Sequence, residues 1–235
     1  MAYKIRRGLC WVILIALASL SIAIEPSAPD SFENISADSP VPSVGTMFNT
    51  SGGTITTLNF NATTQNPRWK AFVGNISGEF ALQNTEGMAI YDWSLTSVQG
   101  EIYATRNSTL VDWDSVSCAT NSDIGKEQDA LGFSTNDEDN INRTFYRQEH
   151  DEFYAGDKFI AADSCPSTNL YVNGTNQSQH YQELLLNYNN LIYTGLLENA
   201  ERGFSNQSYD YQLIVPDNTN QSMPSESYYF YIELI

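Results

Sequence analysis

Apolar and polar residues alternate with a period of two over long parts of this chain. The stretch 76–82 places Phe80 and Leu82 on one face, and 89–95 repeats the pattern after the turn-like residues 84–87. Two alternating runs joined by a short polar turn are typical of a β-hairpin. A third alternation over 98–104 predicts a strand that continues the hairpin into a three-stranded meander.

The same period returns in the second half of the chain. Alternating runs at 183–186 and 191–196 flank the polar turn 187–190, and further runs follow at 209–215 and 228–234. Sustained helical spacing is not apparent after the N-terminal segment. About seven to nine short strands predict an all-β fold, an antiparallel β-sandwich of immunoglobulin-like or jelly-roll style.

Aromatic residues are frequent in and beside the predicted strands. We expect Trp69 and Trp93 to lie in the core, because tryptophan fills sandwich interiors well. Trp113 stands between Asp112 and Asp114 and is predicted to be exposed, where it could face a ligand.

The last run, Tyr228–Leu234, is an aromatic, β-prone strand. At a sheet edge it would be a template for pairing with another subunit. Closing its own sheet is the other role that the pattern allows.

The N-terminus predicts export. Basic residues including Arg6 and Arg7 precede an apolar run of 16 residues, Leu9–Ile24, and Ser21–Ala23 offers small side chains for a peptidase. At about 24 Å the run is short for a bilayer core of about 30 Å. Three interpretations stay open for residues 1–24: a cleaved signal peptide, a pilin-like leader that follows Arg6–Gly8, and a retained anchor.

Composition then divides the remaining chain. Residues 25–53 are rich in Pro, Ser, Asp and Gly, which is typical of a linker. A single β domain is predicted over 54–235, starting near Thr54. Within it, 119–164 reads as a charged, weakly hydrophobic excursion.

The formal charge of the chain is −17, from 28 acidic and 11 basic residues. Such a surface repels phosphate backbones, so nucleic acid is not an expected partner. Asn136–Asn140 is the most acidic stretch of the excursion and resembles a calcium loop. However, Ile141 and Arg147 stand where an EF-hand needs Gly and Glu. The EF-hand is therefore excluded, while an irregular Ca²⁺ site and a solvated loop both stay open.

Three cysteines occur, and Cys10 lies in the apolar leader. Cys118 and Cys165 are then the one pair left, and in an oxidising compartment such a pair is expected to form a disulfide. The bond would tether both ends of the acidic excursion, and chain entropy alone gives it about 4 kcal/mol.

Ten Asn-x-Ser/Thr sequons indicate glycan acceptors on exposed loops, although a chain rich in Asn, Ser and Thr also produces such triplets by chance. We expect Asn75, in a predicted strand, to be the poorest acceptor. The other candidates are Asn34, Asn49, Asn61, Asn107, Asn142, Asn173, Asn176, Asn206 and Asn220.

Catalytic motifs are missing from the sequence: there is no Gly-x-Ser-x-Gly, no His-Glu-x-x-His and no phosphate-binding glycine loop. His150 and His180 stand in polar, turn-like contexts and are expected to be exposed loop residues. We therefore predict no catalytic residues and no cofactor, and leave a metal undefined.

Two long motifs, Trp69–Gly78 and Gly100–Arg106, resemble a family of secreted archaeal surface proteins built from β domains. The resemblance extends to Asp139–Asn142, Cys165, Ile214–Pro216 and Tyr228–Leu234. It implies an archaeal cell envelope, where N-glycosylated β domains are common, and it carries no activity.

The sequence as a whole favours a non-enzymatic extracellular protein of the cell surface with a structural, adhesive or filament-associated role. Its expected partners are components of the cell envelope, glycans, or further copies of the chain joined through an edge strand. A secreted carbohydrate-binding module and a secreted hydrolase are the alternatives.

Overall fold

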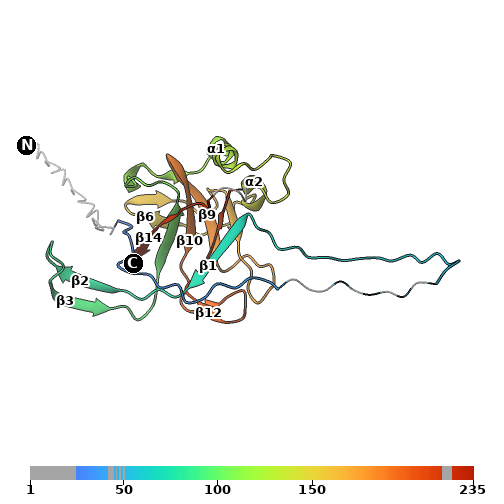
Figure 1. The fold of residues 1–235 in the computed structure, drawn as a ribbon. Helices are drawn as coiled ribbons and strands as arrows, with labels where there is room; N and C mark the ends of the chain where they lie inside the picture. The colour runs from blue at the N-terminus through green and yellow to red at the C-terminus, as the bar shows by residue number, and fades with distance from the viewer. Residues whose placement is uncertain (1–24, 42–44, 46, 48, 50, 219–223) are drawn as a thin grey trace, which may run out of the picture.

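The computed structural model describes residues 25–41, 45, 47, 49, 51–218 and 224–235 (Figure 1). The leader predicted over 1–24 and the sequon at Asn220 lie outside these residues. In the described part of the chain, no helix is long and apolar enough to cross a membrane. Strands dominate and pair antiparallel, which confirms the all-β class.

The strands are short and spread over most of the chain. They are β1 (Trp69–Gly74), β2 (Glu79–Gln83), β3 (Ala89–Ser94), β4 (Gly100–Thr105), β5 (Ser117–Cys118), β6 (Phe153–Ala155), β7 (Lys158–Ile160), β8 (Ser167–Asn169), β9 (Gln182–Tyr188), β10 (Asn190–Leu196), β11 (Glu201–Arg202), β12 (Ser208–Tyr209), β13 (Tyr211–Pro216) and β14 (Tyr229–Leu234). The helical elements are the 3₁₀ turn η1 (Trp113–Ser115), α1 (Asn121–Leu131) and α2 (Ile141–Thr144).

A six-stranded sheet forms the centre of the molecule, in the order β14-β4-β10-β9-β5 with β8 also paired to β9. The hairpins β2–β3 and β9–β10 confirm the two that the sequence predicts. The three-stranded meander is wrong, because β4 pairs with β10 and β14 and not with β3. Since β4 is buried along its whole length, it needs partners on both edges, and distant strands supply them.

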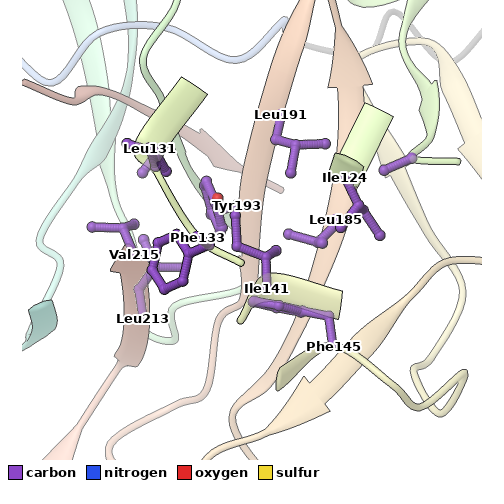
Figure 2. Packing of buried hydrophobic residues seen from close by; sticks show 12 residues of the cluster. Ile124, Leu131, Phe133, Ile141, Phe145, Leu185, Leu191, Tyr193, Leu213 and Val215 are labelled. Carbon is purple, nitrogen blue, oxygen red and sulfur yellow. The ribbon is translucent and has the colours of Figure 1, made fainter. Parts of the chain in front are cut away.

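Side chains from both faces of this sheet are buried. On one face, Leu185 and Tyr193 pack against α1, α2 and β13, and the cluster includes Ile124, Phe145 and Leu213 (Figure 2). On the other face, a second cluster joins strand residues to η1 and the β6–β7 hairpin; it contains Tyr103, Trp113, Val116, Phe153, Ile160, Leu184 and Ile192.

The acidic segment 119–164 is part of this core, which corrects its description as an excursion. It supplies α1, and Thr120 and Asp123 form a capping box at the start of that helix. Gly132 ends the helix in the left-handed conformation, with φ of 77°. Arg106 donates to both carboxylate oxygens of the buried Glu127, at 2.8 and 3.0 Å, and so ties α1 to the end of β4.

Cys118 and Cys165 form the predicted disulfide, with their Cα atoms 4.9 Å apart. Cys118 lies on β5, and Cys165 precedes β8. Both strands pair with the outer edge of β9, one after the other along its length. The bond therefore joins two short strands at the point where one replaces the other on the same edge.

Part of the segment predicted as a linker, 25–53, pairs with the β domain. Ser27 forms an antiparallel bridge with Ile232 on the outer edge of β14, through two backbone hydrogen bonds of 3.0 and 2.8 Å. Pro26 is buried next to Gly156. The described residues from 31 to 65 are exposed and contain no strand, so the first long strand begins at Trp69, later than the predicted start near Thr54.

Candidate functional site

A pocket of about 390 Å³ lies at the end of the central sheet where β4 and β9 begin and where β10 and β14 finish. Four carboxyl side chains line it, together with His180, several amides and an apolar wall. The carboxyl residues are Glu101, Asp151, Glu152 and Glu198.

Glu101 and Glu233 are register partners on β4 and β14, so their side chains point to the same face of the sheet. Glu233 is held by the Tyr103 hydroxyl, which donates to Oε2 over 2.8 Å, and by the Gly156 N–H at 3.1–3.2 Å. Glu101 is equally buried, at 4% exposure, but its Oε2 has no hydrogen-bond partner among the described residues. The two carboxyls are therefore unequal: one is fixed by donors and one is not.

Burial and, to a smaller extent, the negative charge of Glu233 together raise the pKa of Glu101 to about 9. Burial also raises the pKa of Glu233 above its ordinary value, although its bonds from Gly156 and Tyr103 act in the opposite direction. Glu101 therefore holds a proton at neutral pH.

The rim of the pocket is organised by hydrogen bonds. Glu198 accepts from the Tyr181 N–H at 3.0 Å and lies 3.3 Å from Nδ1 of His180. Gln182 accepts from the Asp151 N–H at 2.6 Å and donates back to its Oδ2 at 3.3 Å. His180 lies in the loop before β9, as predicted, and its side chain is partly exposed at this rim.

His150 is buried, which contradicts its prediction as an exposed residue. Its Nε2 accepts from the backbone N–H groups of Ser164 (3.1 Å) and Cys165 (2.9 Å), and its Nδ1 lies 2.8 Å from the Asp151 carbonyl. This pattern fits a neutral ring that holds the loop before the disulfide.

The acidic loop considered for Ca²⁺ is bound by an arginine. Asp137 and Asp139 both form ion pairs with Arg68, which precedes β1, and Trp69 donates its indole N–H to the Asp139 carbonyl at 2.8 Å. Among the described residues, no group of three or more His, Cys, Asp or Glu could hold a metal ion.

A second candidate site is the β2–β3 hairpin, which projects from the rest of the molecule (Figure 1). Phe80 pairs with Trp93 and Leu82 pairs with Tyr91, so one face carries four large apolar side chains. Leu82, Tyr91 and Trp93 are 59%, 60% and 53% exposed, and the Tyr91 and Trp93 rings are 4.8 Å apart. In the described part of the chain, neither outer edge of the hairpin pairs with another strand.

The predictions for Trp113 and Trp93 are both wrong: Trp113 is buried and Trp93 is exposed. Trp113 is 3% exposed and packs against Tyr103 and Tyr231, so it is no ligand-facing residue. Its neighbours Asp112 and Asp114 are exposed, whereas the indole ring between them is buried. Trp93 is exposed, whereas Trp69 packs against the core as predicted.

Of the sequons that the structure describes, Asn107 is the one that is buried. Its Oδ1 accepts from the backbone and hydroxyl of Thr109, and its Nδ2 is enclosed without a partner among the described residues. Asn75 follows β1 and is exposed, so the expectation of a strand position is wrong. The other exposed acceptors are Asn34, Asn49, Asn61, Asn142, Asn173, Asn176 and Asn206.

We expect Asn107 to stay unmodified when the chain is expressed in an N-glycosylating host, because a glycan on its enclosed Nδ2 would have no space. Intact mass measures this directly. Asn142→Gln should remove the mass of one glycan, and Asn107→Gln should remove none; loss of a glycan from the Asn107 variant would contradict the buried placement.

Fold and sites together define a disulfide-bonded all-β protein with an acidic pocket at one sheet end and an exposed aromatic hairpin. No family model, curated protein or solved structure matches this chain.

Proposed function

We propose that this chain is an exported, non-enzymatic cell-surface protein with a structural or adhesive role, and that it assembles with further copies of itself through the β2–β3 hairpin. The carrying observation is the apolar, unpaired hairpin that projects from the core. The leader sequence, the disulfide and the exposed sequons support the extracellular location.

An isolated two-stranded hairpin is marginally stable in water, and an exposed edge with apolar side chains favours further pairing. Leu82, Tyr91 and Trp93 lie in this situation. A partner that adds strands and covers the apolar face would satisfy both the backbone and the side chains.

A second copy of the chain fits this requirement best. Two hairpins related by a two-fold axis present the same unpaired edges and the same apolar face to each other, as an isologous interface needs. Two chains of charge −17 repel each other elsewhere, so an uncharged patch is where they can approach. Salt screens that repulsion, and association should therefore strengthen as ionic strength rises.

The C-terminal strand β14, predicted as a possible edge for pairing with another subunit, is not the proposed assembly element. β14 does lie at the end of the central sheet, but Ser27 occupies the middle of its free edge. The hairpin β2–β3 therefore replaces Tyr228–Leu234 as the proposed assembly element.

We also propose that the fold is a β-sandwich of two layers. The pair β1–β13 lies over the central sheet, where Leu213 and Val215 pack with Leu185 and Tyr193. We assign these two layers to an antiparallel β-sandwich.

A carbohydrate platform is less well supported. Sugar rings stack on flat, exposed aromatic surfaces, whereas the Tyr91 and Trp93 rings meet at 61°. Cell-envelope glycans therefore rank behind self-association for this face.

Replacing Tyr91 and Trp93 together by Ser should weaken self-association at least about 30-fold, because truncating a buried aromatic hot spot costs about 2 kcal/mol or more. Stability of the single chain should change little, since both side chains are exposed in it. Sedimentation velocity over a concentration series in low and high salt measures the association.

A matched control is available on the β6–β7 hairpin. Tyr154 and Phe159 are 55% and 47% exposed and face each other across that hairpin with rings 5.2 Å apart. The double variant Tyr154→Ser, Phe159→Ser should associate like the wild type. A wild-type chain that stays monomeric throughout, or a control that weakens association equally, would overturn the proposed function.

A further inference from the structure

The acidic pocket contains a buried carboxyl group that the described residues leave unsatisfied. Glu101 is 4% exposed, lines the pocket, and has an Oε2 to which none of them donates a hydrogen bond. An unpaired buried polar atom loses its hydrogen bonds to water without replacing them, so such atoms in native structures call for an explanation. Glu233, on the adjacent strand, accepts hydrogen bonds from the Tyr103 hydroxyl and the Gly156 N–H.

The charge of the pocket indicates what would satisfy Glu101. Asp151, Glu152 and Glu198 line the same pocket, and Glu233 is the partner of Glu101 on the neighbouring strand β14. His180 is the one basic side chain among the lining residues, and it is already beside Glu198. A cationic ligand would reduce the repulsion among these carboxyls and supply the missing donor.

The residues that line the pocket indicate which class of cation it could bind. Phe153, Leu196 and Ile235 contribute apolar surface, and amides of Gln179 and Gln182 stand beside the acids. The volume of about 390 Å³ lies within the range of about 300–1,000 Å³ that small-molecule pockets have. The described residues form no three-ligand metal group, whereas an ammonium or guanidinium group needs carboxylates and an apolar lining for its stem.

We propose that this pocket binds an ammonium or guanidinium group on an aliphatic stem, and that Glu101 is the carboxylate that receives it. The same chemistry is found in free alkylamines and in the Lys or Arg side chain of a partner protein. This site is separate from the β2–β3 hairpin and does not depend on the proposed assembly.

Binding is linked to proton release. Glu101 is protonated at neutral pH, because burial and the charge of Glu233 raise its pKa to about 9. An incoming cation favours the ionised form, so the carboxyl proton passes to solvent as the ammonium takes its place. The titratable groups around Glu101 are Tyr103 on its own strand and Glu233 on β14. The other titratable side chains of the pocket lining are Asp151, Glu152, His180 and Glu198.

Isothermal titration of the full chain with 1,5-diaminopentane and with N-acetyl-lysine methylamide tests this inference. Repeating it at pH 7 in two buffers of different ionisation enthalpy measures the proton release. We expect nearly one proton released per bound amine at pH 7 and clearly fewer at pH 9, where about half of the Glu101 carboxyls have already lost the proton. Tighter binding of the diamine would indicate a free amine as the ligand, and tighter binding of the lysine derivative would indicate a protein side chain.

Glu101→Gln should weaken amine binding about tenfold or more at pH 9, since a charged hydrogen bond is lost, and should abolish the proton release. Glu33→Gln is the control, because it makes the same substitution at an exposed residue outside the pocket. The wild-type proton release decides the matter even if the Glu101 variant folds poorly. Absence of amine binding, binding without proton release, or tighter binding of CaCl₂ or 1-pentanol than of either amine would overturn the inference.

Discussion

Glu101→Gln is expected to make the protein more stable at alkaline pH and to remove much of the pH dependence of its stability. In the folded state the pKa of Glu101 is raised from 4.5 to about 9, first by burial and then by the charge of Glu233. Between these two pH values the folded chain holds a proton that the unfolded chain has released.

The sign of the effect follows from this difference. The contribution of this group to stability is fully present below pH 4.5 and is lost as the pH rises toward 9, by about 1.4 kcal/mol per pH unit for one linked proton. Burial also raises the pKa values of Glu183 and Glu233, so they act in the same direction. The wild-type protein should therefore be most stable in mildly acidic solution.

Denaturant unfolding at pH 5, 7 and 9 measures this dependence. Glutamine keeps the shape of Glu101 and cannot ionise, so the variant should lose stability more slowly between pH 5 and 9 than the wild type. Glu33→Gln should follow the wild-type curve. Equal slopes for the Glu101 variant and the wild type would contradict the placement of a protonated carboxyl in the sheet.

Replacing Cys118 and Cys165 together by Ser should reduce the free energy of unfolding by about 4 kcal/mol. The disulfide joins residues 47 positions apart, and without it the unfolded chain is no longer closed into a loop. For a chain of this size the melting temperature should fall by about 8–16 °C. The bond also holds β5 and β8 together on the edge of β9, so loss of this edge should accompany the change.

Thermal and denaturant unfolding of the double variant measure the effect, and reduction of the wild type provides the control. A reducing agent should bring the wild type to the stability of the variant and leave the variant unchanged. A loss below about 1 kcal/mol would mean that β5 and β8 keep their places without the bond.

The local part of the fold could be predicted from the sequence, and the long-range part could not. The hairpins at 79–94 and 182–196 were visible because each contains its own turn and both of its strands. β4 has the same alternation, but its partners begin at residues 190 and 229. A period of two shows that a segment is a strand without showing which strand it pairs with.

The helix α1 was missed because half of its buried face is polar. Ile124 and Leu131 are the large apolar residues of that face, while Glu127 and Gln128 fill the remaining positions. Glu127 is buried through its pairing with Arg106, a residue that one sequence does not connect to it. The capping box from Thr120 to Asp123 and the glycine at 132 were local signals that could have identified the helix.

The pocket could not be predicted for a similar reason. Glu101 occupies a position in an alternating strand where a charged residue indicates a solvent-facing side chain. The residue across from it is another glutamate, Glu233, and this pairing depends on the register of strands that are far apart in the sequence. Trp113 shows the converse, since its acidic neighbours suggested exposure while its ring lies among aromatic residues.

The bridge between Ser27 and Ile232 has a consequence for the order in which the chain acquires its structure. A ribosome makes Ser27 roughly two hundred residues before its partner, at about 5–20 residues per second, so Ser27 waits at least about ten seconds for a strand to dock on. Until β14 has been made, β4 also lacks one of its two neighbours. The earliest described residues are thus among the last to pair with the sheet. The long exposed stretch that follows them allows β1 and β13 to pack before Ser27 pairs with β14.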